Sequence, residues 1–344
     1  MEDSNTKGMP RISLRLHGGL TARHSMELAQ AADRAGFAAA WFAENAFARG
    51  ILPAAAVCAA ATQRLKIGAG VFNPFSRHPS MMAMEIGALD ELSGGRAMLS
   101  IGAGIGSAVQ KIGFSSDKPV VALRDTLAIL RPLLRGEAVS YEGAAFSAKG
   151  VKLDYTPRGD LPIYLAGRGD LTLKLAGEAA DGQLVSNMCS LAFAARGAAR
   201  VRASTEAAGR ADAVGVVQYM PCVVHRDAEE AERIGRRTIA EMVASFWSLG
   251  QRVPTAKEAL LDGTGIPEDE FAEAARRLKA GDDPVTVLDQ RFTRAFSLSG
   301  TPEACLARAA DYAAAGISEL ALTFDGPSAT DEIALLGEAL QRGS

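Results

Sequence analysis

Short apolar runs typical of β-strands alternate with alanine-rich segments of helical periodicity along most of the chain. Parallel neighbouring strands need a long crossover between them, usually a helix, so this alternation predicts an α/β fold with a parallel sheet. The sequence predicts eight strands: Arg11–Leu16, Ala38–Ala43, Leu65–Val71, Ala97–Gly104, Leu161–Gly167, Gly182–Ser186, Val216–His225 and Ser318–Phe324.

Eight strands with helical crossovers match a (β/α)8 TIM barrel in number and order. A doubly wound open sheet is the structural alternative, although it usually has fewer strands. Two stretches exceed a simple barrel: Arg135–Asp160, predicted as a hairpin after strand four, and Ala228–Ser299, predicted as a helical insertion after strand seven. We therefore expect one barrel domain over residues 1–344, with the larger insertion at about 228–299.

Composition limits the partners that this chain can have. Hydrophobic residues make up 48% of the 344 residues, and the net charge is −3 without a long block of like charge, which argues against nucleic acid. No stretch reaches about 18 uninterrupted apolar residues, and the first ten residues do not resemble a secretory signal, so we expect no membrane span and a cytoplasmic protein. The four scattered cysteines support neither a zinc site nor a disulfide framework: Cys58, Cys189, Cys222 and Cys305.

Glycine clusters follow several predicted strands, at the end of a barrel where active sites lie. Ala166–Gly169 precedes a predicted helix and favours either a phosphate site or a tight turn with a solvated Arg168. Asp90 and Glu91, at the other end of the barrel, are predicted to cap a helix and to pair with Arg96. The sequence has no HExxH metal motif and no GxSxG nucleophile motif. The pattern therefore favours a bound cofactor that performs the chemistry.

Four segments carry a family resemblance that covers nearly the whole chain in order. They are GAGVFNPFSRHPSMMAMEIGALDELSGGRAMLSIGAG, RGEAVSYEGAAFSAKGVKL, LAGRGDLTLKLAGEAADGQLVSN and FSLSGTPEACLARAADYAAAGISEL. Together they resemble the bacterial luciferase-like flavin and deazaflavin oxidoreductases, and within these the branch of methylenetetrahydromethanopterin reductase. The first segment is the most specific.

The resemblance implies a luciferase-like barrel, usually a homodimer, with redox chemistry on bound F420 or FMN. It implies a non-prolyl cis peptide at Gly70–Val71 behind the cofactor ring and places Asn73 at the ring edge. The other residues that it implies for cofactor binding are Gly102, Ala103, Gly104, Ala166, Gly167, Arg168, Gly169, Ser186 and Asn187.

Three positions depart from the reductase branch. An acid near the end of strand one is replaced by Arg15, an acid after the strand-four glycines by Ile105, and an Asp-His pair after strand two by Glu44-Asn45. Arg15 is predicted either to bind an anionic substrate or to form an ion pair with Glu44. Glu44 is the best candidate for an acid, a base or a substrate-orienting group. These differences leave the substrate open.

We therefore predict an F420-dependent oxidoreductase that transfers hydride between the cofactor and a small organic substrate, with Glu44, Asn45 and Arg15 as candidate catalytic residues. One alternative is an FMN-dependent luciferase-like monooxygenase. Another is a non-catalytic cofactor-binding protein that has lost its acids. No metal site is predicted.

Overall fold

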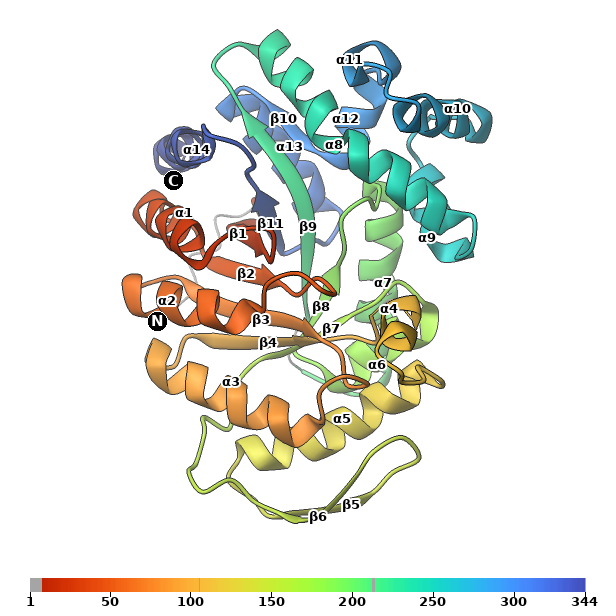
Figure 1. Cartoon of the computed structure of the whole chain (residues 1–344). Coiled ribbons are helices and arrows are strands. Elements are labelled where there is room, and N and C mark those ends of the chain that lie inside the picture. Colours follow the sequence, from red (N-terminus) through yellow and green to blue (C-terminus); the bar gives the residue numbers. More distant parts are fainter. Residues whose placement is uncertain (1–7, 105, 212–213, 344) are drawn as a thin grey trace.

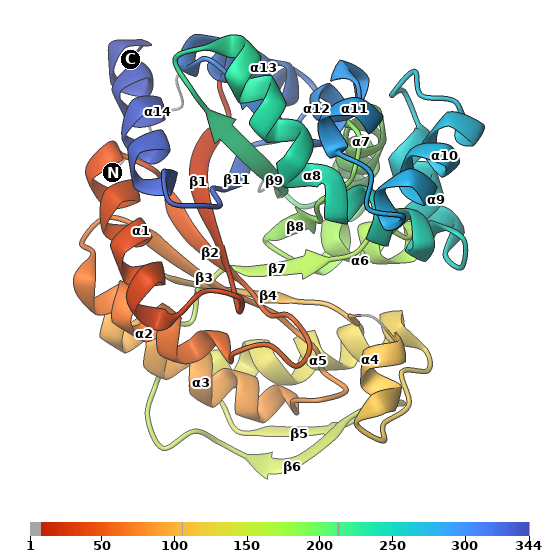
Figure 2. The ribbon, with the colours of Figure 1, turned by 45° about the horizontal axis from the view of Figure 1, so that its top comes forward.

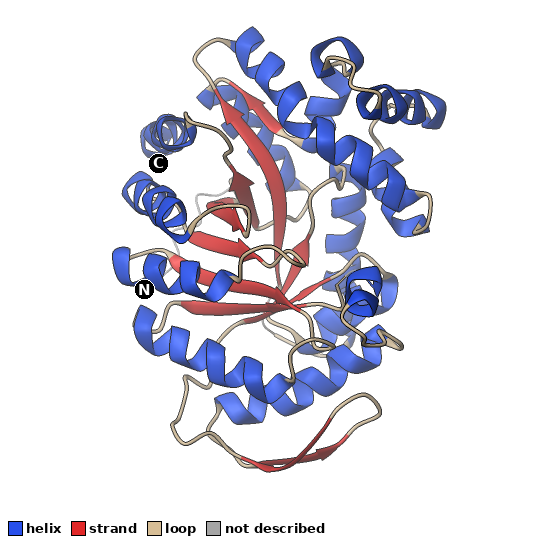
Figure 3. Cartoon of the chain, in the orientation of Figure 1, coloured by secondary structure: helices blue, strands red, loops and turns tan. Residues whose placement is uncertain are grey.

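The computed structural model describes residues 8–104, 106–211 and 214–343. Eight parallel strands pair in a closed ring, in which β1 pairs with β11 and β8 with β9. Figures 1 and 3 show these strands surrounded by helices. The strands of the barrel are β1 (Arg11–His17), β2 (Ala39–Ala43), β3 (Lys66–Phe72), β4 (Ala97–Ile101), β7 (Ile163–Ala166), β8 (Gly182–Val185), β9 (Gly215–Val224) and β11 (Glu319–Thr323).

The predicted (β/α)8 barrel is thus confirmed, and the open-sheet alternative is wrong. Each strand prediction falls on a barrel strand, with ends that differ by up to three residues. The crossover and closing helices are α1 (Ala22–Ala35), α2 (Ile51–Ala61), α3 (Pro79–Ser93), α5 (Pro119–Leu134), α6 (Asp170–Ala179), α7 (Leu191–Ala207), α13 (Pro302–Ala314) and α14 (Ala329–Gly343).

The barrel interior combines packed side chains with a buried carboxylate. Trp41 fills the centre beside Tyr164, with their rings at 4.9 Å and nearly perpendicular. Its indole Nε1 donates to Glu319 at 2.5 Å, Ser13 donates to the same carboxylate at 2.7 Å, and Arg11 pairs with it at 3.1 Å. Because a buried charge is costly unless it is paired and hydrogen-bonded, these three partners explain how Glu319 is accommodated.

The connection between β4 and β7 contains the predicted hairpin, formed by β5 (Val139–Glu142) and β6 (Ser147–Val151). Buried Asp125 on α5 accepts hydrogen bonds from the Tyr141 hydroxyl at 2.8 Å and from the main-chain N–H groups of Ala145 and Phe146 at 2.7 and 3.1 Å. The hairpin is therefore tied to α5. A short helix that the sequence did not predict, α4 (Gly106–Lys111), precedes α5.

The stretch between β9 and α13 is helical, as expected, and packs around its own apolar cluster. Phe271 lies at the centre of this cluster, with the rings of Trp247 and Phe292 at 5.1 and 5.2 Å. Figures 1 and 2 place these helices on the opposite side of the barrel from the β5–β6 hairpin. The elements are α8 (Ala228–Gly250), α9 (Pro254–Leu261), α10 (Glu268–Lys279), α11 (Pro284–Val287), α12 (Gln290–Phe296) and β10 (Leu298–Gly300), which pairs with β9.

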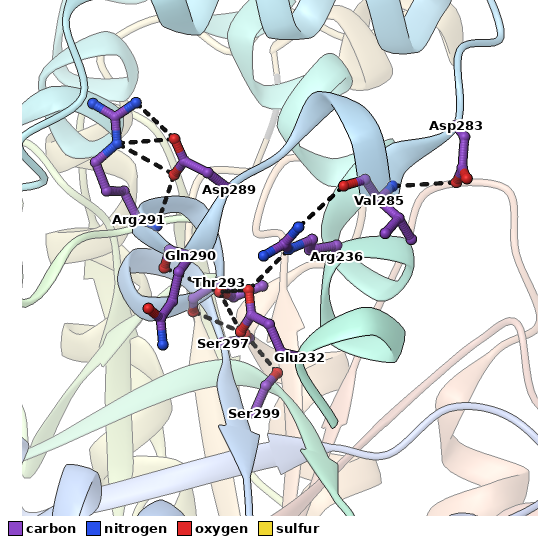
Figure 4. Close-up of polar contacts among 10 residues, drawn as sticks. All are labelled: Glu232, Arg236, Asp283, Val285, Asp289, Gln290, Arg291, Thr293, Ser297 and Ser299. Atoms are coloured by element: carbon purple, nitrogen blue, oxygen red, sulfur yellow. Dashed lines mark hydrogen bonds and ion pairs between the residues drawn. The ribbon is translucent and has the colours of Figure 1, made fainter. Parts of the chain in front are cut away.

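Polar contacts fasten α8 to the end of this stretch (Figure 4). Glu232 accepts hydrogen bonds from Thr293 at 2.8 Å and from Arg236 at 2.9 Å, and Arg236 also donates to the Val285 carbonyl at 3.0 Å. These bonds hold α11 and α12 against α8. Among the described helices, none combines the length and the apolar character that crossing a bilayer requires.

The ion pair predicted between Asp90 and Arg96, at the amino ends of the barrel strands, is wrong. Asp90 accepts from the Ala97 N–H at 3.0 Å and pairs with Arg158 at 3.2 Å, not with Arg96. Arg96 instead donates to main-chain carbonyls, including those of Leu65 and Ala59 at 2.6 and 2.7 Å. Because Arg158 follows the hairpin, its approach to Asp90 depends on the tertiary fold.

Candidate active site

A cavity of about 170 Å³ opens among the carboxyl ends of the barrel strands. Its wall combines small apolar side chains with a few polar ones. Eight of the predicted site residues line it, although they come from five different strands or strand ends. The lining consists of Arg15, Ala43, Glu44, Asn45, Val71, Ala166, Gly167, Arg168, Leu184, Ser186 and Tyr219.

Glu44 follows β2 directly, and its carboxylate is fixed by Arg77. Arg77 donates through Nη1 and Nη2 to both carboxylate oxygens at 3.2–3.3 Å, and its Nε lies 2.9 Å from Glu85. The guanidinium also lies over the Phe72 ring, 4.0 Å from its centroid. Glu44 therefore faces the cavity in a fixed orientation. Asn45 follows it, is exposed, and also lines the cavity.

Arg15 does not pair with Glu44, so that alternative is wrong. The Arg15 Nη1 donates to the Thr323 hydroxyl at 3.1 Å, and the guanidinium lies 4.9 Å from the centroid of the Tyr219 ring. Its Nε is buried without a hydrogen-bond partner, and so is the Tyr219 hydroxyl. Burial lowers the pKa of Arg15 and raises that of Tyr219, and the Arg15 charge partly opposes the second shift.

The end of β3 contains the implied cis peptide, because the bond Gly70–Val71 is cis. Gly70 has a φ of 141°, and a Cβ at this position would collide with the Ser100 carbonyl. A Cβ at Gly102 would lie 2.7 Å from Val71 Cγ1 and 2.9 Å from the Ala166 carbonyl oxygen. Gly102 thus allows β3, β4 and β7 to approach one another beneath the cavity.

Asn73, Ala103 and Gly104 form a contact beside the cavity and do not line it. The Asn73 amide donates to the Ala103 carbonyl at 3.0 Å, and its oxygen accepts from the Phe75 N–H at 2.9 Å. A Cβ at Gly104 would lie 2.6 Å from Asn73 Nδ2. Asn73 therefore braces the glycine turn after β4. Ile105 lies outside the described residues.

Ala166–Gly169 connects β7 to α6 at the cavity rim. Gly169 is the N-cap of α6 without a side-chain capping bond, and no atom lies within 4 Å of the position that a Cβ would take. Arg168 donates through Nη2 to the Asn187 carbonyl at 2.9 Å, and its Nε contacts Cys189 Sγ at 3.3 Å. Arg168 thus joins this turn to the loop after β8.

The two candidates after β8 differ in exposure. Ser186 is half-buried and lines the cavity, whereas the Asn187 side chain is buried and points its amide toward Met242 of α8 at 3.8 Å. The Asn187 Oδ1 has no hydrogen-bond partner. Burial against α8 thus separates Asn187 from the lined part of the mouth.

Sequence reasoning missed Arg77, Tyr219 and Thr323. Arg77 lies in the GAGVFNPFSRHP stretch, but nothing local indicates that it reaches the end of β2. Tyr219 and Thr323 lie within predicted strands, where a side chain that faces the barrel cannot be distinguished from one that faces a helix without the register. The closed ring brings both to Arg15.

Comparisons with known proteins agree with this architecture. The model of the family described as luciferase-like monooxygenase matches residues 8–319. The chain is 30% identical over 318 residues to 5,10-methylenetetrahydromethanopterin reductase of Archaeoglobus fulgidus, which covers 90% of this chain and 92% of the relative. The solved coenzyme F420-dependent tetrahydromethanopterin reductase of Methanopyrus kandleri has a TM-score of 0.82 at 22% identity, over 97% of this chain and 99% of that one. The type II Baeyer-Villiger monooxygenase of Pseudomonas putida, solved in complex with FMN, has a TM-score of 0.73 at 18% identity, over 96% and 97%.

Proposed function

Because the chain belongs to the luciferase-like monooxygenase family, we propose that it is an F420-dependent oxidoreductase acting on a small organic substrate. The observation that carries the proposal is the cavity, where an apolar wall meets polar groups from β1, β2 and the β7–α6 turn. The relative with 30% identity over 90% of the chain is a reductase of this family, which supports a redox reaction.

The residues at the mouth fit a flat cofactor that carries a phosphate. Val71, Ala166 and Leu184 offer an apolar surface for a ring. Gly169 leaves the uncapped N-terminus of α6 open, where N–H groups and the helix dipole favour an anion. Arg168 and Ser186 lie beside it and would hold the phosphate. When bound, F420 would supply a ring carbon that donates or accepts a hydride.

The protein's own contribution is to orient the substrate and to provide fixed charges. Glu44, held by Arg77, presents a carboxylate that can accept a proton or a hydrogen bond from a substrate hydroxyl. Asn45 presents an amide from the loop above. Both line the same cavity as the apolar side chains of Val71, Ala166 and Leu184, so a substrate held there lies beside the cofactor surface.

FMN remains the second candidate cofactor, because a structure with the same fold was solved with FMN. The decisive experiment is titration of the purified protein with F420 and with FMN, read by fluorescence. We expect F420 to bind more tightly. If neither binds below about 1 mM, the proposal fails, and tighter FMN binding with oxygen uptake during turnover would indicate a monooxygenase. Tight binding without turnover of any substrate would indicate a cofactor-binding protein.

We further propose a homodimer in the cytoplasm, with a small-molecule substrate and no nucleic acid or membrane partner. Val57 on α2 and Met81 and Met84 on α3 are large apolar side chains exposed by 38%, 46% and 46%, and a second copy would cover them. Light scattering after size-exclusion chromatography tests the homodimer, because a monomer at micromolar concentration would contradict it.

A further inference from the structure

Arg15 carries a charge that the described part of the chain leaves without a carboxylate partner. It forms no ion pair with a described residue, and its one hydrogen bond is the one from Nη1 to Thr323 at 3.1 Å. The carboxylate of Asp325 acts on Arg15 electrostatically without forming an ion pair with it, and Asp325 Oδ1 lies 3.5 Å from His17 Nε2. Since an arginine side chain keeps its charge in proteins, the positive charge remains at the cavity.

The part of the Arg15 guanidinium without a partner is the edge formed by Nε and Nη2. Nε is buried without a partner, and Nη2 has no hydrogen bond to any described residue. These two nitrogens form a side of the planar fork that matches the two oxygens of a carboxylate. The Tyr219 hydroxyl is a second buried donor without a partner, on a side chain that lines the same cavity.

A comparison within the same strand shows what a structural arginine would look like. Arg11, also on β1, is paired with Glu319 at 3.1 Å. Buried polar groups in proteins are nearly always satisfied, and those that are not require an explanation such as a ligand. Arg15 and Tyr219 are such a pair of groups at the mouth of the barrel.

We propose that Arg15 binds a carboxylate of the substrate, with the Tyr219 hydroxyl as a second donor. This inference rests on the proposed function and adds the substrate class: a small organic acid whose carboxylate lies at Arg15 while the cofactor ring lies against Val71, Ala166 and Leu184.

The test uses benzoate, with benzamide as its uncharged isostere, in calorimetric titrations of the whole protein. We expect benzoate to bind at least about tenfold more tightly than benzamide. Arg15→Met should abolish this preference, Arg15→Lys should restore part of it, and Tyr219→Phe should weaken benzoate binding by a smaller factor. Equal binding of benzoate and benzamide to the wild type would overturn the proposal without relying on any variant.

A second arm decides whether the anion belongs to the substrate or to the cofactor. Benzoate titrations are repeated with the protein saturated with F420. Binding that persists or tightens supports a substrate carboxylate, whereas competitive displacement would assign Arg15 to the cofactor and overturn the inference. Cofactor affinity itself is measured separately, so a failure of the proposed function is recognised independently.

Thermal unfolding separates a binding role from a structural one. Removing an unpaired buried charge should not destabilise the fold, so Arg15→Met should have a Tm equal to or above that of the wild type. Arg11→Met is the matched control and should lower Tm, because it leaves the Glu319 carboxylate without its cation. A Tm loss in Arg15→Met as large as that in Arg11→Met would contradict the proposal.

Discussion

The substitution Gly102→Ala tests whether the glycine after β4 is needed for the close packing of β3, β4 and β7. The new methyl carbon would lie 2.7 Å from Val71 Cγ1 and 2.9 Å from the Ala166 carbonyl oxygen. The first neighbour is the end of a short side chain and the second is main chain, so relief requires β7 to move. Gly102 is buried, and its N–H donates to the Phe72 carbonyl at 3.0 Å, which limits movement of Gly102 itself.

The magnitude follows from two opposing effects. Overpacking a dense site typically costs about 1–3 kcal/mol. Alanine also reduces the freedom of the unfolded chain, which offsets about 0.4–1 kcal/mol. The net loss is therefore about 1–2 kcal/mol. With about 2.1 cal/mol/K of unfolding entropy per residue over 344 residues, this corresponds to roughly 1.5–3 °C in Tm.

Differential scanning calorimetry measures the stability change, and cofactor titration measures its effect on the cavity. Val71 and Ala166 both line the cavity, so cofactor affinity should fall together with Tm. The matched control is Gly169→Ala, where no atom lies within 4 Å of the new carbon. This variant should keep its Tm within about 1 °C. Its cofactor affinity should still fall, because the new methyl group would lie at the proposed phosphate site. If Gly102→Ala unfolds like the wild type and binds cofactor equally well, the reasoning about close approach is refuted.

Three further outcomes are expected. Glu44→Gln should reduce turnover by more than about tenfold while the cofactor dissociation constant stays unchanged, and equal steady-state kinetics would remove Glu44 from the mechanism. Burial is the main cause that raises the pKa of Glu332 in the folded protein. Between the unfolded-state pKa and this higher folded-state pKa the folded protein binds more protons than the unfolded chain, so the stability that Glu332 contributes falls as the pH rises through this interval. The unfolding free energy of the wild type relative to Glu332→Gln should therefore decrease as the pH rises above the ordinary glutamate pKa of about 4.3, and a constant difference in denaturant titrations would contradict this. Asp125→Ala removes the acceptor for three donors of the β5–β6 hairpin, so limited proteolysis should cleave within residues 139–151 faster, whereas an unchanged cleavage rate would count against the tie to α5.

The order and type of the barrel elements could be predicted because they depend on local patterns. The helix α1 begins after Thr21, whose side chain accepts from the His24 N–H, and ends at Gly36 with a φ of 81°, a conformation that favours glycine. The short helix α4 escaped prediction because it has no apolar periodicity and begins within a glycine-rich stretch. Its formation depends on the surrounding loops.

The site was predictable as a set of strand ends but not as a set of contacts. Sequence reasoning named Arg15 and Glu44 and offered an ion pair between them. In the structure, Glu44 pairs with Arg77, and Arg15 donates a hydrogen bond to Thr323. Arg77 is 33 residues from Glu44 and Thr323 is 308 residues from Arg15, so no local pattern indicates either contact.

The sequence by itself determined that eight strands alternate with helices and that glycines end several of them, because periodicity and glycine placement are properties of neighbouring residues. It also carried the resemblance that led to a non-prolyl cis bond at Gly70–Val71, which the structure contains. Only the tertiary structure decided which groups meet at the mouth. Ring closure between β1 and β11 brings Thr323 to Arg15, and β9 brings Tyr219, which leaves one guanidinium edge without a partner. Whether this edge has a hydrogen-bond partner depends on the groups around it in three dimensions, because long-range contacts decide whether a buried charge is paired.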